Sequence, residues 1–198
     1  MNKILTLIVA LTVATLSAKA QESNAETKHE IAVGIGAYSN SQWIDDLETV
    51  TTTLSGVTLG KDSYSGPFSV EYFYHPKSWL GVGGVFVYGH HTQDFYLAGL
   101  KQGKVNDSYV TLMPAAKFDW LRKRHFGMYS KLAAGFTLRR ETAKPSNQNM
   151  SDASESAMHF NWQASLLGIE AGSSVLRGFV EVGVGEQGVA LAGVRFKF

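Results

Sequence analysis

The chain has 198 residues, with 18 Lys and Arg against 17 Asp and Glu, a net charge of +1 at pH 7 and no cysteine. A balanced charge argues against a nucleic-acid partner, because nucleic-acid binding requires a basic surface. The lack of cysteine excludes disulfides, thiolate metal sites and lipid attachment through an N-terminal cysteine.

The N-terminus has the features of an export signal. A short basic start at 1–3 precedes an apolar stretch at 4–16, and Ala18-Lys19-Ala20 is an A-x-A cleavage pattern. The apolar stretch is shorter than the ~20 residues that a membrane-spanning helix needs. We therefore expect a cleavable signal peptide at 1–20 and a flexible polar lead at 21–29, which leaves about 180 residues, the size of one domain.

From residue 30 to the end, apolar and polar residues alternate with a period of two, in segments as long as the strands of membrane barrels. Only helices and closed barrels satisfy all their backbone polar groups in lipid. The sequence predicts an all-β fold over 30–198, an eight-stranded antiparallel up-and-down transmembrane β-barrel. The expected strands are 30–39, 66–75, 79–90, 108–120, 126–139, 157–171, 176–184 and 188–198.

The connections between the expected strands alternate in length. Those at 75–78, 121–124 and 172–175 are short, whereas those at 40–65, 91–107 and 140–156 are long and polar. Membrane barrels have short periplasmic turns and longer extracellular loops. With an even number of strands, the pattern therefore predicts that both chain termini lie on the periplasmic side, and that the last outer connection, at 185–188, is brief.

One face of the expected strands is almost entirely apolar. An exported soluble barrel of lipocalin type would turn this face inward, but an eight-stranded barrel has an interior only just wide enough for side chains. About two dozen bulky residues cannot fit there, so we expect the apolar face to meet lipid. Its aromatic residues gather near the strand ends in two expected girdles, Tyr74, Trp120, Phe196 and Phe198 on the periplasmic side and Phe68, Tyr88, Phe160 and Trp162 on the outer side.

The opposite face carries charged residues that we expect to point into the lumen. A Lys or Arg facing lipid at mid-depth costs about 2–4 kcal/mol, and buried charges persist when they are paired and hydrogen-bonded. The sequence predicts a buried ionic network in the periplasmic half of the barrel; the alternative is a scatter of charges solvated by water in the lumen. The expected members of the network are Glu71, Lys117, Lys131, Glu181 and Arg195.

The chain ends in Leu191-Ala192-Gly193-Val194-Arg195-Phe196-Lys197-Phe198. This segment resembles the terminal strand signal by which bacterial outer-membrane barrels are recognised for assembly, with Gly193, Phe196 and Phe198 at the characteristic positions. With the export signal, the whole mature chain resembles the small OmpA/OmpX-like outer-membrane barrels of Gram-negative bacteria. The resemblance implies a narrow, plugged, monomeric barrel with structural, adhesive or surface-protective roles. It also implies outer-membrane lipids, lipopolysaccharide and the barrel assembly machinery as partners, with an extracellular or envelope protein as a further one.

Residues with catalytic chemistry do not form a recognisable set. Histidines at 90, 91, 125 and 159 and the acid Asp94 are candidates, but adjacent histidines on a strand point to opposite faces. Some barrels of this size modify lipid A, and the strand motif of the deacylases, His-x-Ser, is replaced here by His159-Phe160-Asn161. The first hypothesis is a non-enzymatic barrel with no metal or cofactor, whose outer loops contact other molecules. A lipid A-modifying enzyme is the second hypothesis, and a soluble exported ligand-binding barrel is the third.

Overall fold

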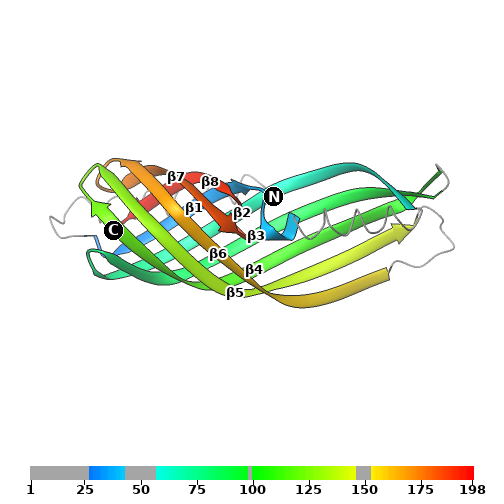
Figure 1. The fold of residues 1–198 in the computed structure, drawn as a ribbon, viewed down its shortest axis with the longest axis horizontal. Helices are drawn as coiled ribbons and strands as arrows, with labels where there is room; N and C mark the ends of the chain where they lie inside the picture. The colour runs from blue at the N-terminus through cyan, green and yellow to red at the C-terminus, as the bar shows by residue number, and fades with distance from the viewer. Residues whose placement is uncertain (1–26, 43–56, 98–99, 146–152) are drawn as a thin grey trace, which may run out of the picture.

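The computed structural model describes residues 27–42, 57–97, 100–145 and 153–198, with side chains described for 27–42, 65–92, 104–142 and 154–198. These residues form a closed barrel in which each strand pairs with the next along the chain (Figure 1). The strands are β1 (His29–Ala37), β2 (Val57–Lys77), β3 (Leu80–Leu97), β4 (Leu100–Arg122), β5 (Phe126–Pro145), β6 (Ala153–Gly172), β7 (Leu176–Gly185) and β8 (Ala190–Lys197). The eight-stranded antiparallel up-and-down barrel predicted from the sequence is confirmed.

The barrel closes where the first strand pairs with the last. β1 and β8 are antiparallel over eight register pairs, from Glu30↔Lys197 to Ala37↔Ala190, with Gly34 opposite Gly193 in the middle. This seam provides hydrogen-bond partners for the edges of the first and last strands, which would have none in an open sheet. Among the described residues, no helix has the length and hydropathy needed to cross a membrane.

Along most of each strand, side chains alternate between the two faces of the wall. In β7 every second residue from Leu176 is exposed, and those between, from Arg177 to Gly185, are buried. Across the barrel, the exposed positions are large and apolar, such as Leu112 at 65 % and Val180 at 56 % exposure, while Lys117, Lys131 and Arg195 are fully buried. Apolar residues outside and charges inside are the reverse of a soluble ligand-binding barrel.

The strand boundaries differ from those expected. The segments 91–107 and 140–156, expected as long loops, are mostly strand, because β3 continues to Leu97, β4 starts at Leu100, β5 ends at Pro145 and β6 starts at Ala153. β2 likewise begins at Val57 rather than at 66, and His29 already belongs to β1. The sequence of these segments is rich in polar residues, so a prediction that requires one apolar face ends these strands too early. The expected signal peptide at 1–20 and residues 43–56 lie outside the described residues.

The lumen also contains apolar side chains that the sequence did not predict. One cluster consists of Phe73, Val85, Val87, Met113 and Ala133. A smaller one consists of Ala32, Phe179 and Leu191. The interior is therefore filled by bulky apolar side chains as well as by charged ones, as the narrow bore of an eight-stranded barrel requires.

Candidate functional site

The half of the lumen nearer the short turns is organised around Arg195 on β8. Its guanidinium donates to Glu170 Oε2 at 2.8 Å and to Glu71 Oε2 at 3.0 Å. The ring centroids of Tyr129 and Phe179 lie 4.6 and 4.7 Å from its central carbon. A planar guanidinium can bind carboxylates in its plane and stack on aromatic rings at the same time, which a lysine at this position could not do.

Three buried lysines surround this arginine. Lys131 forms ion pairs with Glu71 and with Glu181, whose Oε2 lies 2.8 Å from Lys131 Nζ. Lys117 Nζ donates to Glu30 Oε1 at 2.7 Å and lies 4.2 Å from the ring centroid of Tyr129. Lys197 at the end of β8 pairs with Glu170. Each ammonium group therefore has a carboxylate partner within the lumen.

The five charged residues expected to form a lumen network lie in one connected set. Glu71, Lys131, Glu181 and Arg195 contact one another, and Lys117 joins them through carboxylates that Arg195 also contacts. Five further members of this set were not predicted as part of the network. With them, the described set has five carboxylates and five cations, and His75 lies between two of the carboxylates. These members are Glu30, Asp119, Glu170, Arg177 and Lys197.

Glu170 was not predicted because of a local irregularity in β6. The register of β6 against β7 shifts between Ser165 and Leu167, so that side chains after the bulge exchange faces. Strict alternation from Trp162 and Leu166, both exposed, would place residue 170 outside. The bulge places Glu170 inside instead, where Arg177 Nη1 donates to its Oε1 at 2.6 Å.

His75 lies where the network approaches the short-turn end of the barrel. Its Nε2 is 3.3 Å from Glu30 Oε2, and its Nδ1 is 3.3 Å from Asp119 Oδ2. The imidazole packs on Gly81, where a Cβ would be only 2.9 Å from the ring. No group of three His, Asp or Glu side chains in the described part of the chain has an arrangement suited to a metal ion.

Above the network, the β7–β8 turn folds into the barrel rather than away from it. Glu186 and Gln187 are almost completely buried. Gln187 Nε2 donates to Glu71 Oε1 at 2.8 Å, so the turn reaches the ionic network directly. The backbone folds inward with positive φ at Gly185 and Gly188, 139° and 99°, a region that side-chain-bearing residues rarely adopt.

Glu186 is the centre of a second polar cluster, which closes the half of the lumen away from the short turns. Its carboxylate accepts hydrogen bonds from Ser41 Oγ at 2.7 Å, Asn161 Nδ2 at 2.8 Å and Thr111 Oγ1 at 3.2 Å. The backbone N–H of Ser41 donates to the same carboxylate at 3.2 Å. All these donors are neutral, so the cluster differs in kind from the ionic network below it.

Ser41 is held in place by a capped helical turn that follows β1. Ser39 Oγ accepts from the N–H of Gln42 at 3.4 Å, and Gln42 Oε1 accepts from the N–H of Ser39 at 2.8 Å. This reciprocal pair is the capping box that the sequence Ser39-Asn40-Ser41-Gln42 permits. The start of the first outer connection and the β7–β8 turn thus meet inside the barrel.

We expect stability to depend on pH through Glu186. Burial raises the pKa of this turn carboxyl above its ordinary value of 4.5, although its hydrogen bonds oppose the change. Because the folded state binds the proton more tightly than the unfolded state, the free energy of unfolding should fall as the pH rises from 4.5 through the raised pKa. The variant Glu186→Gln, measured by urea unfolding across this range, should lose that part of the slope. The matched control Glu141→Gln, at a more exposed position, should keep it, and equal slopes in wild type and Glu186→Gln would contradict the assignment.

The histidines considered for catalysis are not brought together. His90 is on the outer face, with Nδ1 3.2 Å from Ser108 Oγ, while His91 and His159 are on strands β3 and β6 on the lumen side. His125 bonds the Gly172 carbonyl in the short turns at the opposite end. The side chain of residue 94 is outside the described part. Among the described side chains no serine, histidine and carboxylate are in mutual hydrogen-bond contact.

The residues of the expected assembly signal lie on the closing strand. Gly193 faces Gly34 across the seam, and the rings of Phe196 and Phe198 are 5.7 Å apart. Their role in recognition by the assembly machinery remains a prediction.

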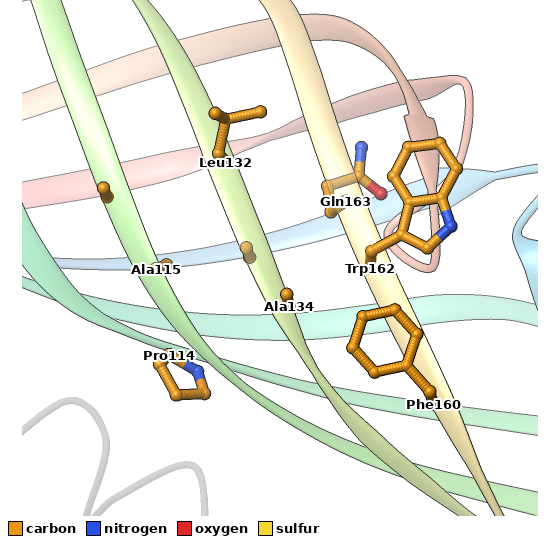
Figure 2. A pocket seen from close by; sticks show the side chains of 9 residues that line it. Pro114, Ala115, Leu132, Ala134, Phe160, Trp162 and Gln163 are labelled. Atoms are coloured by element: carbon orange, nitrogen blue, oxygen red, sulfur yellow. The ribbon is translucent and has the colours of Figure 1, made fainter.

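The outer surface has a groove over β4, β5 and β6, with a volume of about 570 Å³. Its floor is made of small side chains, including Pro114 and Ala134, and its walls are Leu132, Phe160 and Trp162 (Figure 2). Figure 2 shows Phe160 and Trp162 following one another on β6 beside the small residues of the neighbouring strands.

No protein-family model matches the chain, and no curated protein matches it by sequence. Among solved structures, it is similar to Ail, the attachment invasion locus protein of Yersinia pestis in complex with the heparin analogue sucrose octasulfate. The identity is 14 %, the TM-score 0.47, and the match covers 86 % of this chain and 99 % of that one. A second structure of Ail has 13 % identity and a TM-score of 0.44, over 87 % and 97 % of the two chains. The N-terminal β-barrel domain of Pseudomonas aeruginosa OprF has 13 % identity and a TM-score of 0.39, over 87 % and 98 %.

The fold assignment itself rests on the strand pairing and on the distribution of side chains. A closed barrel of eight antiparallel strands, apolar outside and charged inside, is the architecture of small outer-membrane barrels. This agrees with the architecture expected from the sequence.

Proposed function

We propose that the protein resides in the outer membrane, has no enzymatic activity, and uses the outer part of its sheet to contact a protein outside the cell or in the envelope. The apolar belt supports the membrane location, because exposed side chains such as Leu132, Phe136 and Leu166 would be unfavourable in water. The lumen is filled by paired charges and by the inserted turn, so transport through the barrel is not part of the proposal.

The observation that carries the proposal is the unequal length of the strands. β6 starts at Ala153 but pairs with β7 only from Gln163 onward, and β2 starts at Val57 but pairs with β1 only from Phe68 onward. Strands β2 to β6 therefore extend together beyond the ends of β1, β7 and β8, as Figure 1 shows on its right side.

This extension gives the sheet two edges with no partner among the described strands. The exposed residues of β6 at the start of its edge are polar, namely Ser154, Glu155 and Ser156. An edge strand with free backbone donors and acceptors can bind a further strand from another protein, with side chains setting the specificity. Polar side chains on such an edge limit nonspecific pairing while leaving the backbone available.

A barrel with most of its extension removed, including the polar start of the β6 edge, would test the proposal. In this variant Asn-Gly turns replace 91–107 and 139–157, which joins the register partners His90 and Ser108, and Leu138 and Met158. Expressing cells should lose at least ten-fold in adhesion to protein-coated surfaces or in cell–cell aggregation, while the variant remains in the outer-membrane fraction and heat-modifiable on gels.

The matched control is a variant with Asn-Gly in place of 173–175, at the opposite end of the barrel, which should behave like wild type. Unchanged adhesion and aggregation of the shortened barrel would contradict the surface role. A difference in lipid A acyl chains between cells that lack the protein and cells that overproduce it would contradict the non-enzymatic role.

A further inference from the structure

We propose that the groove over β4 to β6 binds one acyl chain of a phosphorylated glycolipid of the outer leaflet, and that Arg140 binds its phosphate. This inference rests on the membrane location in the proposed function. It adds a specific lipid site to a surface that would otherwise meet lipid nonspecifically.

The groove exists because small residues interrupt a belt of large ones. Pro114, Ala116 and Ala134 line it, whereas the walls carry Leu132 and Phe160. Outward neighbours beyond the walls are again large, with Leu112 and Phe136 exposed at 65 % and 56 %. The depression is thus a local property of three strands and not of the whole barrel surface.

Pro114 also alters the backbone beneath the groove. The pairing of β4 with β5 is interrupted between Leu112↔Phe136 and Ala115↔Ala133. Proline has no N–H to donate to a ladder, so an interruption at this position is expected. The floor of the groove therefore combines short side chains with a gap in the pairing of β4 and β5, across which the register is kept.

The shape and chemistry of the groove favour a single aliphatic chain. No charged residue lines it, and its one polar residue, Gln163, is buried, so the occupant meets mainly apolar side chains. A second barrel would present a convex wall, which would touch the ridges at Leu132, Phe160 and Trp162 without reaching the floor. A flexible chain can fill a narrow depression, and the volume of about 570 Å³ lies within the ~300–1,000 Å³ usual for small-molecule sites.

The position of Arg140 indicates which lipid this is. On β5 the outward residues after Ala134 are Phe136 and Leu138, both exposed, and Arg140 is the first charged one. Six residues of strand are about 20 Å long, or about 15 Å of depth at a tilt of about 40°. One leaflet of a hydrocarbon core ~30 Å thick has that depth.

An acyl chain whose tip lies near Ala134 at mid-depth would therefore have its headgroup beside Arg140. This is the side of the membrane away from the short turns. A guanidinium binds phosphate oxygens in pairs and keeps its charge at all relevant pH values. Because the outer leaflet lies on this side, the matching ligand is an acylated glycolipid that carries phosphate.

Native mass spectrometry of the full refolded protein, released from detergent micelles, would test the site. The probes are bis-phosphorylated lipid A, dephosphorylated lipid A and phosphatidylglycerol, each added at the same concentration. Wild type should retain bis-phosphorylated lipid A in preference to the other two. Ala134→Phe, which fills the groove, should reduce the retained fraction at least five-fold, and Ala116→Leu should have the same direction of effect.

Arg140→Gln should weaken retention of the bis-phosphorylated probe about three-fold and leave the dephosphorylated probe unchanged. The controls are Val180→Phe, on the exposed face of β7, and Arg124→Gln, in a short turn, and both should retain lipid A as wild type does.

Equal retention by wild type and Ala134→Phe would overturn the site, and preferential retention of phosphatidylglycerol would overturn the choice of glycolipid. Heat-modifiable migration and insertion into vesicles are measured on the same samples. A barrel that inserts but shows no selective lipid A binding contradicts only this inference, whereas a chain that fails to insert contradicts the proposed function.

Discussion

Replacing Arg195 by methionine is expected to lower the free energy of unfolding by about 3–5 kcal/mol, the usual cost of removing one member of a buried ion pair. The guanidinium lies within 3.7 Å of carboxylates on four strands, and all of these groups are buried. Without it, Glu71 and Glu170 keep their other cationic partners, but the network has one more negative charge than positive. Urea unfolding of the protein in lipid vesicles would measure the loss.

Two controls separate this effect from a general loss of charge. Arg124→Met, at an exposed turn, should change stability by no more than about 0.5 kcal/mol. The double variant Arg195→Met with Glu71→Gln restores the charge balance, so its loss should be smaller than the sum of the two single losses. If Arg195→Met behaved like Arg124→Met, the lumen charges would be solvated by water rather than paired, which is the alternative that the sequence left open.

Gly36→Val is expected to displace the β7–β8 turn from the lumen and to cost about 1–3 kcal/mol, the range for overpacking a well-filled interior. A Cβ added to Gly36 would overlap the backbone carbonyl of Gln187, and a backbone group in a tight turn cannot move aside as a flexible side chain can. Displacing the turn also separates Glu186 from its donors. Hydrogen exchange at 185–189 should therefore become faster than in the strands on either side.

The matched control for this variant is Gly178→Ala on β7. The nearest atom to an added Cβ there is the Ala171 carbonyl oxygen at 4.0 Å, so the substitution has space. It should leave both the stability and the exchange of the turn close to wild type. Unchanged exchange at 185–189 in Gly36→Val would show that the turn does not depend on the close approach of β1.

The sequence predicted the number of strands, their order and the face that meets lipid, because those features follow from a period of two maintained over the whole chain. It predicted the strand ends poorly beyond the apolar belt. There, in the outer parts of β3 to β6, the sequence is rich in polar residues, and the backbones still pair as strands. Hydrophobic alternation arises only where a strand has one apolar face, so it cannot show where a strand ends in such polar segments.

The ionic network was predictable in part for the same reason. Lys117, Lys131 and Arg195 alternate in phase with apolar neighbours, so their inward direction could be inferred from local sequence. Glu170 could not be placed, because a single bulge reverses the phase of β6. The contacts of Glu186 depend on chain segments distant in sequence, and the short helical turn after β1 that holds Ser41 was not predicted.

The groove had no sequence signal of its own. Pro114, Ala134 and Trp162 are unremarkable within their own strands, and the depression arises only when the registers of β4, β5 and β6 place the small residues side by side. Predicting the groove would require the register of three neighbouring strands, whereas hydrophobic alternation describes each strand separately.

The inward turn between β7 and β8 has a consequence for how the molecule is assembled. Glu186 accepts hydrogen bonds from Ser41, which follows β1, and from Thr111 on β4 and Asn161 on β6, so its partners span both sides of the seam between the first and last strands. These contacts cannot all form while that seam is open. Closure of the β1–β8 seam and the hydrogen bonding of Glu186 are therefore coupled, because a barrel closed in another register would leave this buried carboxylate without its donors.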